Sequence, residues 1–265
     1  MKLDKRALIL NSIIEAYLNE NTPISSLACE AHLSESDLNI AASTIRLYFR
    51  QLVDEGELEK VHISSGRVPT LRAMKQYWSK ILKLNEKLII KNAKTLEEVA
   101  KNFEIYCLVY AGRALYLQEV AKLNDRFLML DFEEEELVLK FSPQAFSFLK
   151  EVVGLDVFSL ESLALRLKFD ELFQKIALLK QGLNLFRTNE TKAYQIYQSD
   201  EFVKLLDSSI HSYFKSFLEF SPLFNEGFMG LLLEAEFLGK EANIILAGSV
   251  FTDFKKVIHH IKEVA

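Results

Sequence analysis

The nine residues HISSGRVPT, from His62 to Thr70, constrain the fold of this chain more than any other stretch. The run ELEKVHIS up to Ser64 and the short run RVP after Gly66 are typical of two β-strands joined by a tight turn, with Gly66 free to take a positive φ. Thr70 then stands where it can cap a helix beginning LRAMKQYWSK. The stretch therefore predicts a two-stranded hairpin followed at once by a helix.

Three helices are predicted before the hairpin. Apolar residues in 4–18 recur with the ~3.6-residue period of a helix that buries one face. A shorter helix follows Pro23, with Ser25 or Ser26 as its cap, and a third runs over about 42–55. Two helices, a turn, a third helix and a hairpin together indicate a winged helix-turn-helix.

The charge of the chain is distributed unevenly. The formal net charge is -5, but residues 1–83 hold eleven Lys and Arg against ten Asp and Glu. The stretch 60–83 holds six basic residues and no acid. Because a polyanion responds to the local field near a patch, the negative total does not exclude DNA as a partner.

The third predicted helix has a face without carboxylates opposite its buried side. Side chains on such a face can reach base edges or phosphates when the helix lies in the major groove. Each feature also has an interpretation that involves no DNA. The helix face could be an ordinary solvent-exposed face, and the hairpin could be a surface hairpin in which Arg67 has no role. The two features together favour DNA binding.

Three stretches resemble a known family: STIR at Ser43–Arg46, LVDEGELEKVHISSGRVPT at Leu52–Thr70, and the C-terminal NIILAGSVFTDFKKVIHHIKEVA. They are similar to the heat-inducible transcription repressor HrcA family, from whose pattern Leu47 and Tyr48 depart. The resemblance implies a cytoplasmic homodimer that represses chaperone operons by binding double-stranded DNA at an inverted repeat. It also implies that the chaperonin modulates the activity of the protein.

The candidate DNA-binding residues combine the helix face with the hairpin. Arginines and Lys60 would bind phosphate, residues of the helix face would meet bases, and the amides of the Ser-Ser turn would approach the backbone closely. Arg67 would grip a phosphate or enter the minor groove. The full set is Ser43, Thr44, Arg46, Leu47, Arg50, Gln51, Lys60, His62, Ser64, Ser65, Gly66 and Arg67.

The remainder of the chain predicts an α+β layout. Strand-like runs EIYCLVYA, FLMLDF, ELVLKF, LLLEAEFL and ANIILAGS alternate with helical stretches at 143–153, 160–179 and 201–218, and Thr252 is expected to cap a final helix. By resemblance, the domains are a winged helix-turn-helix at 1–72, a linker helix at 73–94, a GAF-like domain at 95–165 and 225–265, and an inserted dimerisation segment at 166–224.

The sequence gives little support for a metal site, a disulfide, a catalytic site or a membrane span. Cys29 and Cys107 lie far apart, which favours neither a zinc site nor a disulfide. The acidic run at 131–137 could bind a cation, although a solvated turn is the simpler interpretation. No P-loop, GxSxG, HExxH or GxGxxG pattern occurs, so we expect no catalytic residue, no metal and no cofactor. Uncharged runs are too short for a membrane span, and the N-terminus does not read as a secretory signal.

Two further functions stay open. A ligand-sensing or protein-interaction adaptor would use the winged helix to dock a protein, and its affinity would depend less on salt than DNA binding does. A GAF-like fold could also contain a small-molecule pocket, but a scaffold role is favoured because the sequence shows no set of polar residues that would converge on a ligand.

The chain contains twenty phenylalanines. This number is consistent with a chaperonin client that exposes apolar surface, and equally with a large core and a dimer interface.

Overall fold

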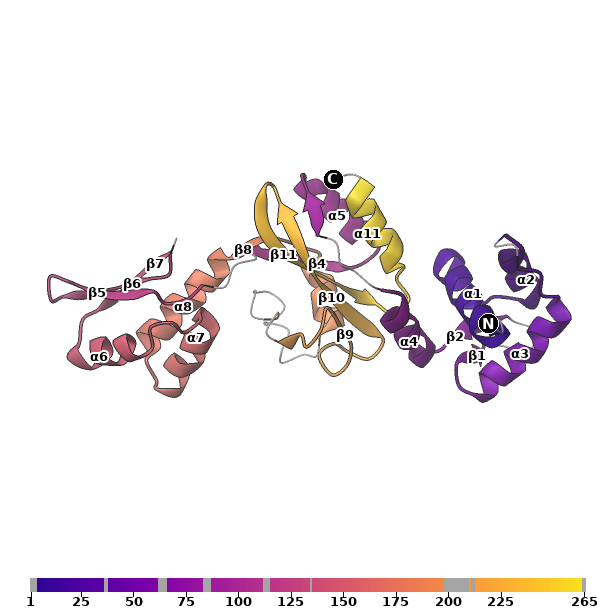
Figure 1. The fold of residues 1–265 in the computed structure, drawn as a ribbon, viewed down its shortest axis with the longest axis horizontal. Helices are drawn as coiled ribbons and strands as arrows, with labels where there is room; N and C mark the ends of the chain where they lie inside the picture. The colour runs from indigo at the N-terminus through magenta and orange to yellow at the C-terminus, as the bar shows by residue number, and fades with distance from the viewer. Residues whose placement is uncertain are drawn as a thin grey trace.

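The computed structural model describes residues 4–35, 38–61, 66–82, 87–111, 115–133, 135–197, 210 and 213–263. Their helices and strands gather in three units that lie in a row, as Figure 1 shows. We call residues 4–69 the N-terminal unit, 71–111 together with 184–263 the central unit, and 115–183 the outer unit. No helix among the described residues has the length and apolar character needed to cross a bilayer.

The N-terminal unit consists of helices followed by an antiparallel hairpin. Its elements are α1 Lys5–Glu20, α2 Ser26–Glu35, α3 Ala42–Asp54, β1 Leu58–Lys60 and β2 Arg67–Pro69. Ser25, one of the two predicted caps, accepts a hydrogen bond from the Ala28 amide at 3.1 Å. Thr70 likewise accepts from the Ala73 amide at 3.2 Å and caps α4, Leu71–Ile81. The order of elements is the predicted one.

One apolar core holds the N-terminal unit together, and it contains Ile9, Ile13, Ala16, Ile24, Cys29, Leu33, Ile40, Ile45, Phe49, Leu52 and Leu58. The α3 residues Ile45, Phe49 and Leu52 recur at the helical period, so one side of α3 is buried. The opposite side of α3 is therefore left to solvent.

The central unit is built on a sheet with the strand order β3-β10-β11-β4-β8, in which β9 also pairs with β10. β3 runs parallel to β10, and the other pairs are antiparallel. Its remaining elements are β3 Leu88–Ile90, α5 Ala93–Asn102, β4 Tyr106–Ala111, β8 Asn184–Thr188, α9 Glu190–Ile196, β9 Leu218–Glu219, β10 Phe228–Phe237, β11 Lys240–Ser249 and α11 Phe254–Glu263. The strand-like runs LLLEAEFL and ANIILAGS lie in β10 and β11, which pair as an antiparallel hairpin.

Helices cover both faces of the central sheet. Alternate residues of β4 belong to different cores, with Cys107 and Val109 on one face and Tyr106 and Leu108 on the other. The first face packs against α4, α5 and α11, and the second packs against α9. This two-sided burial explains why the β4 run is almost continuously apolar.

The outer unit has a sheet and a core of its own. Its elements are β5 Glu119–Leu123, β6 Phe127–Asp131, β7 Glu136–Lys140, α6 Pro143–Glu151, α7 Val157–Arg166 and α8 Asp170–Gly182. The strands form an antiparallel meander with the order β5-β6-β7. Leu128, Leu130 and Leu139 are fully buried against the helices of this unit.

The structure draws the boundaries of the inserted segment differently from the prediction of 166–224. The chain leaves the central sheet after β4 and returns at β8, so residues 115–183 form the separate unit. β8, α9 and β9 instead pair within the central sheet or pack on it. The physical reason is that β5, β6 and β7 pair only with one another, and their apolar side is covered by helices from the same segment. The dimerisation role of an inserted segment stays a prediction.

The predicted linker helix at 73–94 also differs from the structure. α4 ends at Ile81, and Leu88–Ile90 form β3, because Trp78 and Leu88 are buried in the core of the central sheet. This stretch is therefore part of the central unit.

Local predictions about helices fared differently. The stretch 160–179 is helical as predicted but is divided between α7 and α8, where Lys168 takes a left-handed φ of 55°. Asp253 rather than Thr252 caps α11, since its Oδ1 accepts from the Lys256 amide at 3.2 Å. The predicted helix at 201–218 lies mostly outside the described residues.

Candidate nucleic-acid interface

The exposed side of α3 carries most of the predicted DNA-binding side chains of that helix. Thr44 is half-buried at its edge, and Leu47 is 64% exposed. The exposed members are Ser43, Arg46, Leu47, Arg50 and Gln51. These side chains share one face because the opposite face is anchored in the core.

The start of α2 adjoins this face. Nε of Arg46 donates a hydrogen bond to Oγ of Ser26 at 3.1 Å, and Leu27 next to it is 64% exposed. The first turn of α2 holds no acidic residue, so the positive end of the helix dipole and the Arg46 guanidinium lie side by side. Ser26 was predicted only as a possible cap and Leu27 not at all, although a capped helix just before α3 is a signal for residues that border its exposed face.

The C-terminal end of α3 has a different character. Nε2 of Gln51 donates to Oε1 of Glu55 at 2.8 Å, and Nε of Arg6 donates to Oε2 at 2.8 Å. The hydrogen bond from Arg6, followed by that from Gln51, lowers the pKa of Glu55, so this carboxylate stays ionised at neutral pH. Because Arg6 and Glu55 neutralise each other, this end of α3 adds no net positive charge for a phosphate, and Gln51 would have to give up its bond to read a base.

The base of the hairpin is tied to α4. Oγ1 of Thr70 donates to the carbonyl of Gly56 at 2.9 Å. Glu57 is only 3% exposed, and its carboxylate lies 3.2 Å from Nη2 of Arg72. These contacts set the angle between the hairpin and α4.

Lys60 and Arg67 lie opposite each other across the hairpin. Lys60 is exposed, whereas Arg67 is half-buried and its guanidinium carbon lies 5.9 Å from the centre of the Phe49 ring. The Arg67 amide donates to the Ile24 carbonyl at 2.8 Å, and the Ile24 amide donates back at 2.9 Å. Arg67 therefore has a packing role that the sequence analysis did not foresee. The predicted residues His62, Ser64 and Ser65 lie outside the described residues.

Gly66 is required for a reason other than the predicted one. Its φ lies outside the positive range, but a Cβ there would come within 2.5 Å of the carbonyl carbon and oxygen of Ile24. A side chain at this position would push the hairpin away from the loop that joins α1 and α2.

We therefore expect Gly66→Ala to destabilise the N-terminal unit by about 1–3 kcal/mol, the usual effect of forcing atoms into a filled space. Thermal unfolding followed by circular dichroism would measure the change. Gly182→Ala is the matched control, because a Cβ at Gly182 meets no atom within 4 Å and φ there is not positive. Equal melting temperatures for the two variants would contradict the close-approach explanation.

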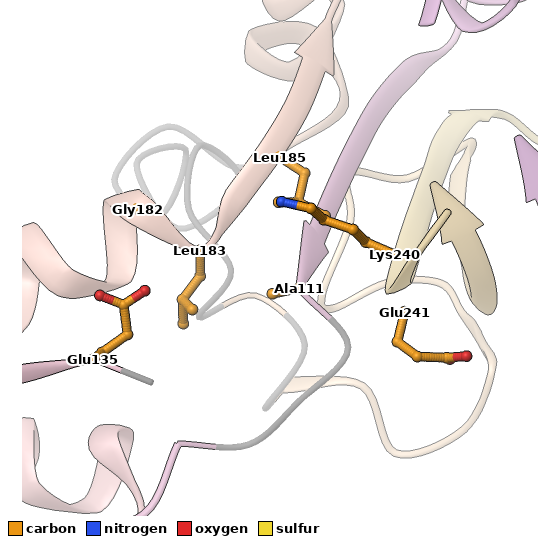
Figure 2. Close-up of a pocket in the computed structure, with 7 residues that line it drawn as sticks. All are labelled: Ala111, Glu135, Gly182, Leu183, Leu185, Lys240 and Glu241. Atoms are coloured by element: carbon orange, nitrogen blue, oxygen red, sulfur yellow. The ribbon is translucent and has the colours of Figure 1, made fainter. Parts of the chain in front are cut away.

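A pocket of about 570 Å³ lies where the outer unit joins the central sheet, and Figure 2 shows residues that line it. Glu135 and Glu241 stand on opposite sides of it, and Glu241 is paired with Lys87. Among the described lining residues the polar groups do not converge on one point, unlike those of a typical ligand site. Within the acidic run, Asp131 ends β6, Glu136 begins β7, and the Glu133 amide donates to Asp131 at 2.8 Å.

Comparison with known proteins identifies similar chains. A family model described as the HrcA C-terminal domain matches residues 78–265. Heat-inducible transcription repressors HrcA from two strains of Helicobacter pylori are 28% identical over 263 residues and 27% identical over 255 residues. The first match covers 98% of this chain and 96% of the relative, and the second covers 96% and 92%. The repressor of the same name from Mycoplasma mobile is 34% identical over 127 residues, which is 48% of this chain and 35% of that protein.

Proposed function

This chain belongs to the HrcA family of heat-inducible transcription repressors, and from that premise we propose that it binds an inverted-repeat operator as a dimer through α3. It is a repressor of heat-shock gene transcription and not an enzyme. The exposed side of the first half of α3, which has no acidic residue of its own and lies next to the start of α2, is the observation that carries the proposed mode of binding.

The N-terminal unit would act as a winged helix-turn-helix with α3 in the major groove. The order of its elements and the antiparallel pairing of β1 with β2 support this assignment. Ser43, Thr44 and Leu47 would face bases, and an apolar side chain such as Leu47 can contact a thymine methyl group. Phosphates would be held by Arg46, Arg50 and Lys60, with Arg67 and the hairpin turn alongside.

The outer unit would provide the dimer contact, in place of the range 166–224 expected from the resemblance. Support comes from large apolar side chains that this unit leaves exposed, among them Leu123, Phe127, Val138, Leu165, Leu167 and Leu178. A second copy covering them would remove apolar area from water. The dimer would then place two copies of α3 at a whole number of helical turns, each roughly 34 Å.

The chaperonin would keep the repressor in its DNA-binding state. Before it dimerises, the chain would expose the apolar side chains of the outer unit to water. A chaperonin binds chains that expose apolar surface of this kind. Diversion of the chaperonin to unfolded proteins during heat would then lower the amount of active dimer. The GAF-like assignment of the central unit is compatible with a scaffold role in this scheme.

The test is a gel-shift titration with a duplex that carries the family-type inverted repeat and with a scrambled duplex of the same composition. We expect the repeat to bind at least about 10³-fold more tightly, with an affinity that falls steeply as salt rises. Added chaperonin should increase the active fraction. Equal binding to both duplexes would overturn the operator proposal, and preference without a chaperonin effect would remove only the proposed regulation.

A further inference from the structure

Helix α1 belongs to two cores at once. Ile9 and Ile13 lie in the core of the N-terminal unit, whereas Ile14 lies in the core of the central unit. Tyr17 meets Phe251 edge-on with ring centres 5.7 Å apart. α1 is therefore the helix through which the proposed DNA-binding unit rests on the rest of the molecule.

α1 lies beside α4 in Figure 1, and lysine side chains of α11 also reach it. Helices α4 and α11 are firmly joined to the central sheet. Nε1 of Trp78 in α4 donates to the Val250 carbonyl at 2.6 Å, and the Trp78 and Phe254 rings meet edge-on at 6.0 Å. A shift of α1 relative to α4 and α11 is thus a shift of the N-terminal unit relative to the central unit.

Three side chains from three helices meet at this contact. Oη of Tyr77 donates to Oε1 of Glu15 at 3.1 Å. Nζ of Lys255 lies 2.9 Å from Oη of Tyr77 and 3.3 Å from Oε1 of Glu15. Burial, followed by the negative charge of Glu15, raises the pKa of Tyr77, so the hydroxyl keeps the proton that it donates. Each member of the cluster contacts the other two.

A cluster of this kind restricts movement in a way that apolar contacts do not. Apolar side chains can slide past one another at small cost, because the hydrophobic effect has no preferred direction. Hydrogen bonds weaken steeply when their angles change, so they select one rotation of α1. A second polar contact, from Nζ of Lys256 to Oδ1 of Asn19 at 2.6 Å, lies one turn further along α1.

The orientation of the N-terminal unit needs such a second point of attachment. The link from β2 through Thr70 into α4, with the Glu57–Arg72 ion pair beside it, is one point of attachment, and a body held near one point can still rotate. Contacts of α1 with α4 and α11 supply the second point. Together they determine the direction in which α3 faces.

We propose that Glu15, Tyr77 and Lys255 are positioning residues that hold the two α3 helices of the dimer at the separation required by the operator. The proposal rests on the proposed function, because it presupposes a dimer on two half-sites. It adds that the preference for one spacing between half-sites is set at the α1, α4 and α11 contact, far from any base-reading side chain. These residues would not alter the affinity of one N-terminal unit for one half-site.

The experiment measures binding to a series of duplexes in which the spacer between the inverted half-sites changes by one base pair at a time, and to a duplex with a single half-site. The variants are Lys255→Glu, Glu15→Lys and the double exchange. Lys255→Glu places two carboxylates together, so we expect the affinity at the best spacing to fall at least about fivefold and the preference for that spacing to flatten. Affinity for the single half-site should stay within about twofold, and the double exchange should restore the spacing preference.

Two controls separate this effect from others. Lys262→Glu makes the same charge change on the same helix, and it should keep the wild-type spacing profile. Tyr77→Phe removes only the hydroxyl and keeps the ring, so it tests the cluster even where a charge reversal impairs folding. An unchanged spacing profile in both Lys255→Glu and Tyr77→Phe, or an equal loss on the full operator and the single half-site, would overturn the proposal. Wild-type protein that prefers no operator at all would instead refute the proposed function.

Discussion

Replacing Arg50 with alanine is expected to weaken binding to DNA of every sequence and to flatten the dependence of affinity on salt. Arg50 is exposed on α3 and forms no ion pair with any residue that the structure describes. In a dimer the substitution removes two phosphate contacts, which should reduce the slope of log affinity against log salt by about 2. Over a fourfold rise in salt, the variant should therefore lose about tenfold less affinity than the wild type.

The measurement is a pair of salt titrations, one on the operator and one on scrambled DNA. Leu47→Ala is the contrasting variant, because it carries no charge and should change sequence preference while leaving the slope intact. Arg187→Ala removes an exposed arginine of the central sheet that is paired with Glu190, and it should change neither property. A slope for Arg50→Ala equal to that of wild type would exclude Arg50 from the phosphate contacts.

Replacing Trp78 with alanine is expected to have the largest effect on stability. Trp78 is fully buried, its ring meets those of Tyr77 and Phe254, and its Nε1 donates to the Val250 carbonyl. Truncation of a buried tryptophan costs about 3–5 kcal/mol, and the buried carbonyl would lose its donor as well. We expect the melting temperature to fall by about 6–20 °C.

Calorimetry of Trp78→Ala beside Trp78→Phe separates the two contributions. The phenylalanine variant keeps most of the ring packing and loses the hydrogen bond, so its cost should be about 1–3 kcal/mol. Since Trp78 joins α4 to the central unit, operator binding should also fail at lower temperature in Trp78→Ala. A melting temperature within ~2 °C of wild type would show that this site contributes little to stability.

Local patterns in the sequence predicted the N-terminal unit well. The burial of Ile45, Phe49 and Leu52 follows from their spacing along one helix, and the Thr70 cap follows from the residue type and its position. The hydrogen bond between Gln51 and Glu55 could also be predicted from the sequence, because residues four apart are neighbours on a helix. The exposed face of α3 was therefore predictable as soon as its buried face was recognised.

Features that depend on distant contacts could not be predicted in this way. β3 has three residues and is a strand because it pairs with β10, far along the chain. The outer unit was misplaced because strand-like runs do not reveal which strands pair with which. Arg67 looked like a side chain presented to DNA, but its packing on Phe49 depends on how the hairpin folds back onto α3.

The sequence by itself determined the order of helices and hairpin at the N-terminus, the face of α3 that remains exposed, and the family to which the chain belongs. Each of these depends on residues close together in the chain, where helical period, caps and turns act. Only the tertiary structure decided why Gly66 must lack a side chain, which segment leaves the central sheet, and how Glu15, Tyr77 and Lys255 meet. Those features depend on residues up to 240 positions apart, whose contacts are set by the packing of whole helices and strands.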